Sequence, residues 1–503
     1  MKKYIILLLL GVFTVGCTDL EEKPVGLIDP ATYYNNTSEL QAAVNGSYGL
    51  MSAEKYWGRA LTLTVMLRSD MCDIGNTATN VERREVNNFS VNDNNALITP
   101  LWQQSYSIIG AANQAIDGSK KIVGDQAKIN AIVAEAYFYR AFAYYNLVRL
   151  FGAIPYIDFA VKDISSVSTI SKTAEADVYK KIIADLEFAK LWLPNKPAIK
   201  AKPSKGTAAA YLSSLYLTLG NYQKAYDESK YVITNEALFG LGLETDFQDL
   251  FNSAKALSLK EPLFTIDYTN IELGDQGRDF QGFLTGIDLD KTYAWGGGFS
   301  VAVPSLKVYN SWDQRDYRRA VSFDTVMRIT ATSAPIPYTA FTSAIAPKRP
   351  HIAKYQRFAG PAGLNGRTSS NNYATMRYAE VLLTAAEALN EITPGTTEAN
   401  GYLNRILARA RNKAGKIVSF PPNVTLGLSQ SDFRKAVLEQ RRLELAFEFV
   451  RWFDIKRLKI GIEVFGATGY EPQPKFDPAK HYYFPFPGIE ITRNPNLAPN
   501  NPF

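Results

Sequence analysis

The stretch from Ser431 to Lys459 reads SDFRKAVLEQRRLELAFEFVRWFDIKRLK and contains no proline or glycine. The absence of these helix breakers predicts helical structure. Ser431 and Asp432 are typical of a helix N-cap, because their short polar side chains can accept hydrogen bonds from free backbone N–H groups. Taken alone, the stretch fits a basic helix that binds nucleic acid, a helix that carries catalytic carboxylates, or an inner helix of an α-helical scaffold.

Opposite charges recur three residues apart along this stretch, and the four pairs are Glu439 with Arg442, Arg441 with Glu444, Glu448 with Arg451, and Asp454 with Arg457. Such pairs are neighbours on the surface of a helix. The large apolar residues between them are Leu438, Leu445, Phe449, Trp452, Phe453 and Leu458. A helix with one solvated face keeps its large apolar residues on the other face. Because charged and aromatic residues alternate around the circumference here, we expect neighbouring segments to cover several faces of this helix.

The composition is that of an ordinary globular protein, since 46% of the 503 residues are hydrophobic and 21% are charged. The net charge is +6, and two of the positive charges are Lys2 and Lys3. This excess is too small to indicate nucleic-acid binding. Aromatic residues make up 12% of the chain. They fit either a core rich in rings or exposed rings that stack on flat ligands such as sugars.

The first residues have the pattern of an export signal. Two lysines precede an apolar run from Tyr4 to Val15, which is too short to remain as a membrane-spanning helix. The ending Val15-Gly16-Cys17 resembles a bacterial lipobox, in which the signal is cut before the cysteine and the cysteine is acylated. We therefore expect a signal peptide over residues 1–16, lipidation of Cys17, and anchoring to a membrane through the lipid. An ordinary secretory signal is the alternative.

Residues 17–30 are expected to form a tether between the lipid and the folded part. Residues 18–22, TDLEE, are acidic and resemble a surface-export signal, although a plain flexible tether has the same composition. Cys72 is the only other cysteine, so a lipidated Cys17 leaves no disulfide framework. No later stretch is long and apolar enough to predict a transmembrane helix.

Helical hairpins organise most of the remaining chain. In residues 205–235, the run Leu219-Gly220-Asn221-Tyr222 resembles the tetratricopeptide turn, where a small residue lets two antiparallel helices cross closely. One such unit cannot bury its own apolar face. The other predicted pairs are 101–117 with 126–151, 373–393 with 397–413, and 431–448 with 450–460. The expected fold class is therefore mainly α, with about four tetratricopeptide-like hairpins.

Residues 240–370 interrupt the helical rhythm. They are rich in glycine, proline, threonine, serine and asparagine and contain short β-like runs such as EPLFTIDYTN at 261–270. We expect a loop-rich insertion with short β-strands, between an N-terminal helical part over 31–239 and a C-terminal helical part with a docked tail over 371–503. Because insertions on a rigid scaffold often carry binding residues, residues 240–370 are the candidate ligand region.

Four segments resemble the SusD/RagB family of outer-membrane nutrient-binding lipoproteins, in matching order and spacing over nearly the whole mature chain. They are AEAYFYRAFAYYNLVRLFGAIPY (134–156), RYAEVLLTAAEALNEI (377–392), LEQRRLELAFEFVRWFDIKRLK (438–459) and YYFPFPGIEITRNPNL (482–497). The chain departs from the family pattern at Gln440, where glutamate is usual, at Phe449-Val450, where a Gly-His pair is typical, and at Phe486, where isoleucine is normal. These differences concern helix packing and the tail, so they leave the expected fold unchanged.

The resemblance implies a cell-surface lipoprotein of the outer membrane that binds oligosaccharide or polysaccharide nutrients. It also implies a partner, a SusC-like TonB-dependent β-barrel transporter that the lipoprotein covers as a lid. The RagB branch serves peptide import, so a peptide- or glycopeptide-binding lipoprotein of the same import system is the alternative. A lid whose own ligand contacts are weak is a third possibility. The family is not enzymatic and implies no cofactor.

The residues themselves also argue against an enzyme. The two histidines, His351 and His481, have no motif context, and we expect both to be structural or exposed. No metalloprotease, hydrolase-elbow or phosphate-loop motif is present, and no metal site is predicted. A glycosidase needs only two carboxylates, but the acids in the strongest motifs lie on helices with basic or aromatic neighbours. We expect these acids to be interhelical salt-bridge or hydrogen-bond partners, and they are Glu135, Glu380, Glu387, Glu444, Glu448 and Asp454.

A sugar site needs exposed rings for stacking and amide, acidic or arginine side chains that bind hydroxyl groups. The resemblance points to the loops after the first helix and to the central insertion. The candidate ligand-binding residues in these regions are Trp295, Tyr293, Trp57, Tyr56, Arg68 and Asp70, and Asp73 lies beside them. Trp295 is favoured because the glycines that follow it, 296–298, leave a ring exposed. Trp102 and Trp312 have helical context and are expected in the core.

Overall fold

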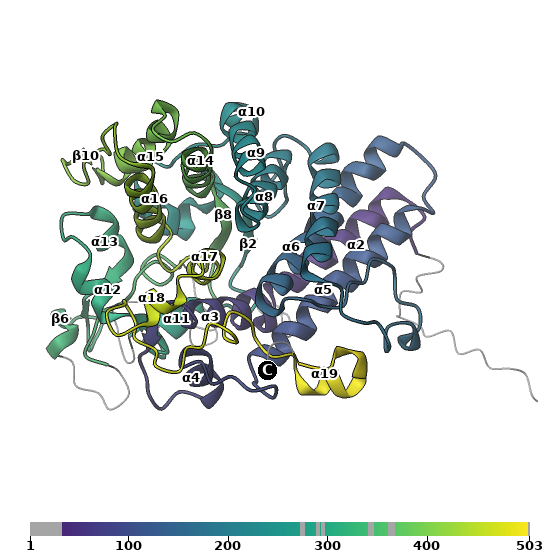
Figure 1. Ribbon diagram of the computed structural model, residues 1–503, viewed down its shortest axis with the longest axis horizontal. Coiled ribbons are helices and arrows are strands. Elements are labelled where there is room, and N and C mark those ends of the chain that lie inside the picture. Colours follow the sequence, from purple (N-terminus) through teal and green to yellow (C-terminus); the bar gives the residue numbers. More distant parts are fainter. Residues whose placement is uncertain are drawn as a thin grey trace, which may run out of the picture.

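The computed structural model describes residues 33–271, 277–287, 292, 297–340, 347–360 and 368–500. Its longer helices stand side by side in a layer that runs from α2 on the right of Figure 1 to α14, α15 and α16 on the upper left. These helices are α2 (Thr37–Gly49), α5 (Ile98–Ser119), α6 (Gln126–Phe151), α7 (Glu175–Trp192), α8 (Lys205–Thr218), α9 (Tyr222–Thr234), α14 (Tyr378–Ile392), α15 (Thr397–Ala410) and α16 (Gln430–Glu444). The fold is mainly α, as the sequence predicts.

Neighbours in the chain pack as hairpins, and the hairpins stack on one another. Helix α5 packs on α6, α8 on α9, and α14 on α15, which confirms three of the four predicted hairpins. The stack is continuous because α6 also packs on α7, α7 on α8, and α9 on α14. Each hairpin thereby buries the apolar face that it cannot bury alone.

The turn between α8 and α9 has the geometry that its sequence predicts. Gly220 has φ of +69°, a left-handed conformation that favours glycine. The side chain of Asn221 accepts a hydrogen bond from the backbone N–H of Lys224 and caps α9. At the helix crossing, Ser213 Oγ lies 2.5 Å from Ser229 Oγ. The small residues therefore let the two helices approach closely.

The stretch from Ser431 to Lys459 forms two helices, as the predicted pair 431–448 with 450–460 implies. Helix α16 ends at Glu444, and α17 (Arg451–Leu458) starts after a turn in which Phe447 and Phe449 have φ of +64° and +66°. The N-cap is Ser429, whose side chain accepts from the N–H of Asp432. Helix α16 packs on α14, and α17 packs on α3 (Ala60–Leu67). The fourth predicted pair is therefore looser than the other three: the left-handed turn separates α16 from α17, and the ion pair between Arg441 and Asp454 joins them.

Two of the four predicted ion pairs within this stretch form. Arg442 binds Glu439 at 2.6 Å and Arg457 binds Asp454 at 2.8 Å, and each pair lies within one helix. Arg451 binds Asp70, at 2.7 Å, instead of Glu448. That pairing is wrong because the turn separates Glu448 from α17.

The predicted pair of Arg441 with Glu444 is also absent. Arg441 crosses instead to Asp454, at 2.7 Å, and to Glu380, at 2.6 Å. The expectation that several faces of the stretch are covered is nevertheless correct, because Trp452 is fully buried and Asp454 is nearly so.

In the described part of the chain, short strands form five two-stranded antiparallel sheets, most of them within or beside the predicted insertion. The pairs are β1 (Cys72–Ile74) with β3 (Ala302–Pro304), β2 (Pro262–Asp267) with β8 (Asn372–Arg377), β4 (Phe323–Asp324) with β7 (His351–Ile352), β5 (Val326–Met327) with β6 (Ile336–Pro337), and β9 (Asn412–Lys413) with β10 (Lys416–Ile417). The β-like run at 261–270 thus contains β2, as expected. The shorter helices are α4 (Val81–Asn87), α10 (Glu236–Phe239), α11 (Gln281–Thr285), α12 (Leu306–Ser311), α13 (Tyr317–Ser322), α18 (Gly461–Phe465) and α19 (Gly488–Arg493).

The C-terminal tail docks on the first hairpin. Phe484 and Phe486 are fully buried, and the Phe486 ring centroid lies 5.1 Å from that of Trp102. The backbone N–H of Phe484 donates to the carbonyl of Leu150 at 2.8 Å. Trp102 and Trp312 are both 3% exposed, which confirms that they belong to the core. Within the described residues, no helix has the length and apolar character needed to cross a bilayer.

Candidate functional site

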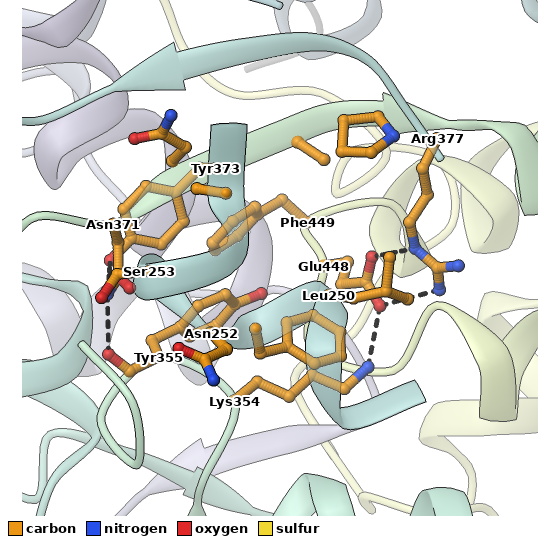
Figure 2. Close-up of a pocket in the computed structure, with 15 residues that line it drawn as sticks. Leu250, Asn252, Ser253, Lys354, Tyr355, Asn371, Tyr373, Arg377, Glu448 and Phe449 are labelled. Carbon is orange, nitrogen blue, oxygen red and sulfur yellow. Dashed lines mark hydrogen bonds and ion pairs between the residues drawn. The ribbon is translucent and has the colours of Figure 1, made fainter. Parts of the chain in front are cut away.

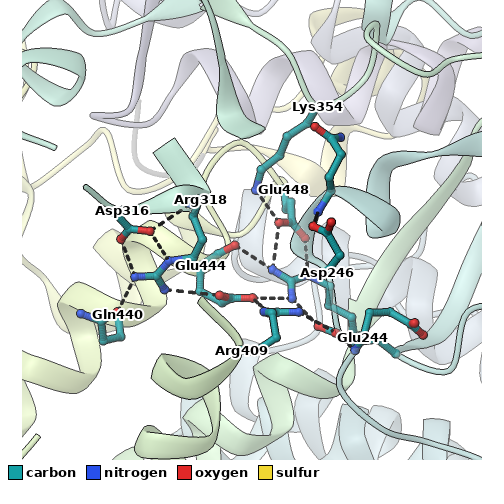
Figure 3. A network of polar contacts seen from close by, with 12 residues as sticks. Glu244, Asp246, Asp316, Arg318, Lys354, Arg409, Gln440, Glu444 and Glu448 are labelled. Atoms are coloured by element: carbon teal, nitrogen blue, oxygen red, sulfur yellow. Dashed lines mark hydrogen bonds and ion pairs between the residues drawn. The ribbon is translucent and has the colours of Figure 1, made fainter. Parts of the chain in front are cut away.

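The carboxylate of Glu444 is enclosed by arginines from three different segments (Figure 3). Arg377 Nη1 lies 2.7 Å from Glu444 Oε1, Arg318 Nη1 lies 3.3 Å from Oε2, and Arg409 also binds Oε1. Burial raises the pKa of Glu444, but the three arginines outweigh it and lower the pKa to about 2. A carboxylate that stays ionised and fully paired holds neighbouring segments together and is a poor proton donor.

The other acids of the strong motifs are also paired. Glu448 binds Arg377 and Lys354, and Asp454 binds Arg441 and Arg457. The remaining pairs are Glu380 with Arg441, Glu387 with Arg457, and Glu135 with Lys202. The prediction that these six acids are salt-bridge partners is therefore confirmed.

The first loop region buries the side chains that were expected to contact a ligand. Tyr56, Trp57, Arg68 and Asp70 are at most 5% exposed. Tyr56 and Trp57 lie in the π-helical segment Glu54–Gly58, which directs both rings into the core. The Trp57 ring packs edge-on against Phe449, with ring centroids 5.5 Å apart. The expectation of exposed rings here is wrong.

Arg68 and Asp70 are buried and connect segments of the interior, so neither is a surface group. The Arg68 guanidinium lies 4.0 Å from the ring centroid of Phe89 and 4.6 Å from that of Phe484, so it links the loop region to the docked tail. Asp70 accepts two hydrogen bonds from Arg451, each 2.7 Å long. Asp70 is thus buried together with its ion-pair partner, and the Arg68 guanidinium donates to the backbone carbonyls of Val86 and His481.

Tyr293 and Trp295, the ring residues predicted in the insertion, lie outside the described residues. The chain on both sides of them is described, and it pairs with itself. The backbone N–H of Phe299 donates to the carbonyl of Phe283 at 2.5 Å, and that of Val301 donates to the carbonyl of Leu284 at 2.7 Å. We call residues 283–287 and 297–301 the stem.

One glycine of the predicted run is needed for this pairing. A Cβ atom on Gly298 would lie 2.4 Å from the carbonyl oxygen of Phe283 and 2.6 Å from the Cα atom of Gly286. Only glycine fits such a close backbone approach. The stem also carries two rings: Phe283 and Phe299 pack edge-on with centroids 4.0 Å apart, and Phe299 is 38% exposed.

A buried histidine supports the stem. His351 Nε2 lies 2.9 Å from Ser300 Oγ, and Nδ1 donates to the carbonyl of Arg349 at 3.0 Å. Burial lowers the pKa of His351 to about 4, so the ring is neutral at pH 7. His481 Nδ1 accepts from the backbone N–H of Asp477 at 2.8 Å. Both histidines are therefore structural, as predicted, and the described part of the chain contains no cluster of acidic, histidine or cysteine side chains suited to a metal ion.

A pocket opens beside strand β8, where the short helical segment Phe247–Phe251 faces the turn between α16 and α17 (Figure 2). It contains about 560 Å³ of empty space, part of which is open to solvent. Its walls include the rings of Tyr355, Tyr373 and Phe449. We call this the β8 pocket.

Two kinds of polar group line the β8 pocket at different ends (Figure 2). Asn371 and Ser253 lie at one end, next to Tyr373. At the other end, Glu448 accepts hydrogen bonds from Lys354 Nζ at 2.8 Å and from Arg377 Nε at 2.6 Å. Burial lowers the pKa of Lys354 to about 8, although Glu448 opposes the shift.

No sequence pattern singles out Tyr355, Tyr373 or Lys354, which line the β8 pocket. Tyr355 and Lys354 come from a loop whose pattern predicts nothing specific, and Tyr373 lies in β8, where the sequence predicts the helix 373–393. One signal was present. Phe449 stands where the family pattern has glycine, and its φ of +66° is a conformation that glycine adopts without strain.

Comparisons with known proteins agree on one family. A model described as "SusD family" matches residues 306–503, and one described as "Starch-binding associating with outer membrane" matches residues 28–217. The SusD-like protein P2 of Formosa agariphila is 56% identical, and the alignment covers the full length of both chains.

Solved structures share the fold. A SusD homolog from Bacteroides thetaiotaomicron superposes with a TM-score of 0.81 at 21% identity, over 94% of this chain and 98% of that one. A protein described as a laminarin-binding SusD-like protein gives a TM-score of 0.77 at 20% identity, over 92% of this chain and 98% of that one.

Proposed function

Because the chain belongs to the SusD family, we propose that it is a cell-surface lipoprotein that binds oligosaccharide or polysaccharide nutrients and delivers them to a SusC-like TonB-dependent transporter in the outer membrane. The observation that carries the proposal is the 56% identity to a SusD-like protein along the full length of both chains. One family model combines starch binding with the outer membrane in its description. A neighbour with the same fold is described as binding laminarin.

The anchor in this proposal is a lipid on Cys17, followed by a tether over residues 17–30. Both precede the first described residue, Tyr33. The lipid holds the folded part at the membrane without a spanning segment. Replacing Cys17 with alanine should release the chain from the membrane fraction of the native cells, and a variant that stays there would contradict lipid anchoring.

The surface that we propose for glycan binding is the stem together with Tyr293 and Trp295. The exposed ring of Phe299 supports this choice, because an aromatic face in contact with water can stack on the apolar face of a sugar. The paired backbones on both sides of the segment hold its ends at a fixed separation. A preformed base of this kind reduces the entropy lost when a ligand binds.

The paired state of the motif carboxylates supports binding rather than catalysis. Glu444 and Glu448 are both engaged by basic side chains, and a hydrolase needs one carboxyl group with a raised pKa beside one that is free to act as base or nucleophile. We therefore propose that the protein releases its bound polysaccharide without cleaving it. Release of reducing ends, abolished by substitution of a single carboxylate, would contradict this.

Affinity electrophoresis of a soluble form that starts at residue 18 tests glycan binding. Gels that contain laminarin, starch or another neutral polysaccharide should retard the protein, whereas an oligopeptide library should give no signal. Trp295→Ala and Phe299→Ala should reduce the retardation. Phe159→Ala is the control, because its ring is 42% exposed and lies outside the insertion. Peptide binding without any glycan signal would overturn the proposal in favour of the peptide-import alternative.

The transporter is tested separately. A tagged full-length chain purified from the native cells in mild detergent should bring a β-barrel transporter with it, identified by mass spectrometry. Cys17→Ala is the control, since the released protein should lose that partner. Purification of the lipidated chain alone would contradict the import complex while leaving glycan binding intact.

A further inference from the structure

We propose that the apolar run Val25-Gly26-Leu27-Ile28 docks in a groove on the folded part of the same chain. The groove lies between helix α5, the loop 155–168 and the C-terminal tail, and we call it the α5 groove. The inference goes beyond the proposed function, because it assigns a docking site to a segment of the chain itself. It does not depend on whether the protein binds glycan.

The α5 groove has room for a short apolar segment. Water-sized groups can enter about 410 Å³ of it, which lies within the range of about 300–1,000 Å³ that is usual for ligand pockets. Most of the lining is apolar and comes from Trp102, Tyr106, Ile157, Ile164, Val167 and Leu497. Ile164 is 80% exposed. Covering such a surface with another apolar segment is favourable, because it removes apolar area from water.

Hydrogen bonds hold the walls of the α5 groove in place. Tyr106 Oη donates to the carbonyl of Pro155 at 2.8 Å, which fixes the loop on the helix. The side-chain amide of Asn494 donates to the carbonyl of Ile170 at 2.8 Å, which fixes the tail on the same loop. The groove is therefore already formed before a segment enters it, and a preformed site reduces the entropy lost on binding.

The N-terminal chain joins the folded part at the helix that forms one wall of the groove. Tyr33 is the first described residue. The ring of the next residue, Tyr34, packs on Gly118 near the end of α5, where a Cβ atom would lie 2.4 Å from Tyr34 Cγ. Because a helix rises about 1.5 Å per residue, Tyr106 lies about 18 Å along the axis from Gly118. The groove is therefore close to the point at which the N-terminal chain joins.

The loop 155–168 covers the interval between these two places on α5. Asn113 Nδ2 donates to the carbonyl of Ile157 at 2.8 Å, and Gln114 Nε2 donates to the carbonyl of Val161 at 3.4 Å. Gln114 is one helical turn before Gly118. The loop thus runs along α5 from the groove toward the position of Tyr34.

The chain that precedes Tyr33 has the length and the composition to fill the α5 groove. Extended backbone spans about 3.3 Å per residue, so residue 28 can lie up to about 17 Å from Tyr33, and residue 25 up to about 26 Å. These limits bracket the 18 Å or so that separate Gly118 from Tyr106. Within residues 17–32, Val25, Leu27 and Ile28 are the large aliphatic residues that stand close together, whereas residues 18–22 are mostly polar or acidic.

Docking shortens the connection to the membrane. Residues 17–32 could span up to about 53 Å if all of them were extended, but residues 17–24 alone span at most about 26 Å. The α5 groove would then determine which side of the folded part faces the membrane. This consequence rests on the lipid that we propose on Cys17, whereas the docking itself does not.

Disulfide trapping in the soluble form that starts at residue 18 tests the docking. Gly26→Cys adds a thiol to the run without removing an apolar side chain, and Ser168→Cys adds one to the groove. The native Cys72 is buried and does not compete. Oxidised glutathione should link positions 26 and 168 within one chain, as detected by mass spectrometry after digestion.

The matched control combines Gly26→Cys with Val123→Cys. Val123 is 98% exposed in the turn that follows α5, so it lies near the point at which the N-terminal chain joins. A segment that moves without docking would meet both positions, whereas a docked segment should link to position 168 at least about fivefold more. Equal yields at positions 168 and 123 would overturn the proposal.

Further substitutions in the trapping pair test the role of the apolar side chains. Leu27→Asp together with Ile28→Asp should lower the yield to that of the Val123 control, and Thr32→Asp, outside the run, should leave it unchanged. Undiminished trapping in the double Asp variant would overturn the proposal. So would a disulfide between two chains whose yield rises with protein concentration, because a second copy would then fill the groove. Retardation in polysaccharide gels should be the same for all these variants, which separates failure of docking from failure of the proposed function.

Discussion

Phe449 stacks nearly parallel on Tyr355, with ring centroids 5.5 Å apart, while its own backbone holds φ at +66°. The ring contact and the backbone strain belong to the same residue and oppose each other energetically. Phe449 is 8% exposed, so the contacts of its buried ring offset the strain. The turn between α16 and α17 therefore stays closed although two phenylalanines in it are left-handed.

Substitution of Phe449 separates these two contributions. Phe449→Ala removes the ring and keeps the strain, and we expect a loss of about 3–5 kcal/mol in the free energy of unfolding. Phe449→Gly removes both and should be more stable than the alanine variant by about 1 kcal/mol. Urea titration followed by circular dichroism measures the difference. Equal stability of the two variants would show that the left-handed turn is not strained.

The buried network around Glu444 should be far more sensitive than the exposed pairs on the same helix. Glu444→Gln leaves Arg377, Arg409 and Arg318 without their shared carboxylate, and we expect a loss of about 3–5 kcal/mol. The control is Glu439→Gln, because the Glu439 side chain is 44% exposed where it binds Arg442, and its loss should be below about 1 kcal/mol. Similar thermal midpoints for the two variants would show that the Glu444 carboxylate, with its three arginines, contributes no more to stability than the exposed Glu439 carboxylate.

The helical architecture was predictable from sequence because local patterns specify it. The turn at Gly220 and the apolar periodicity of α6 and α14 each identify an element before any tertiary contact is known. A break at residue 449 is expected from the predicted pair 431–448 with 450–460, but its left-handed geometry was not predictable from propensity, since phenylalanine rarely adopts a positive φ. Only the departure of Phe449 from the family's glycine indicated it.

The candidate site was less predictable for a related reason. Tyr56 and Trp57 have the composition of a sugar site, but composition does not reveal that a π-helical segment turns both rings inward. The pairing of Asp70 with Arg451, 381 positions away in the chain, depends on tertiary structure alone. Tyr293 and Trp295 lie outside the described residues, so the prediction for them stays a prediction.

Trp452 and Asp454 should affect stability without selectively affecting the ligand. Trp452 is fully buried, and Asp454 joins Arg441 to Arg457. We expect Trp452→Ala to cost about 3–5 kcal/mol and Asp454→Ala a similar amount, because it leaves two buried arginines with one carboxylate fewer. At low temperature, the fraction that remains folded should be retarded normally in polysaccharide gels. Loss of retardation by a fully folded variant would place α17 in the glycan site.

Acidification should lower the free energy of unfolding through His351, the buried histidine that supports the stem. The pKa of the buried ring is about 4, below the value of about 6.5 in an unfolded chain. The unfolded state therefore binds the proton first as pH falls. The stabilisation is complete above pH 6.5 and is lost progressively toward pH 4, by roughly 3 kcal/mol in total. His351→Asn, which cannot be protonated, should have a free energy of unfolding that falls less steeply between pH 6.5 and 4.5 than that of the unsubstituted protein. Urea titrations of both proteins at several pH values measure the two slopes, and parallel slopes would show that His351 is not the titrating group.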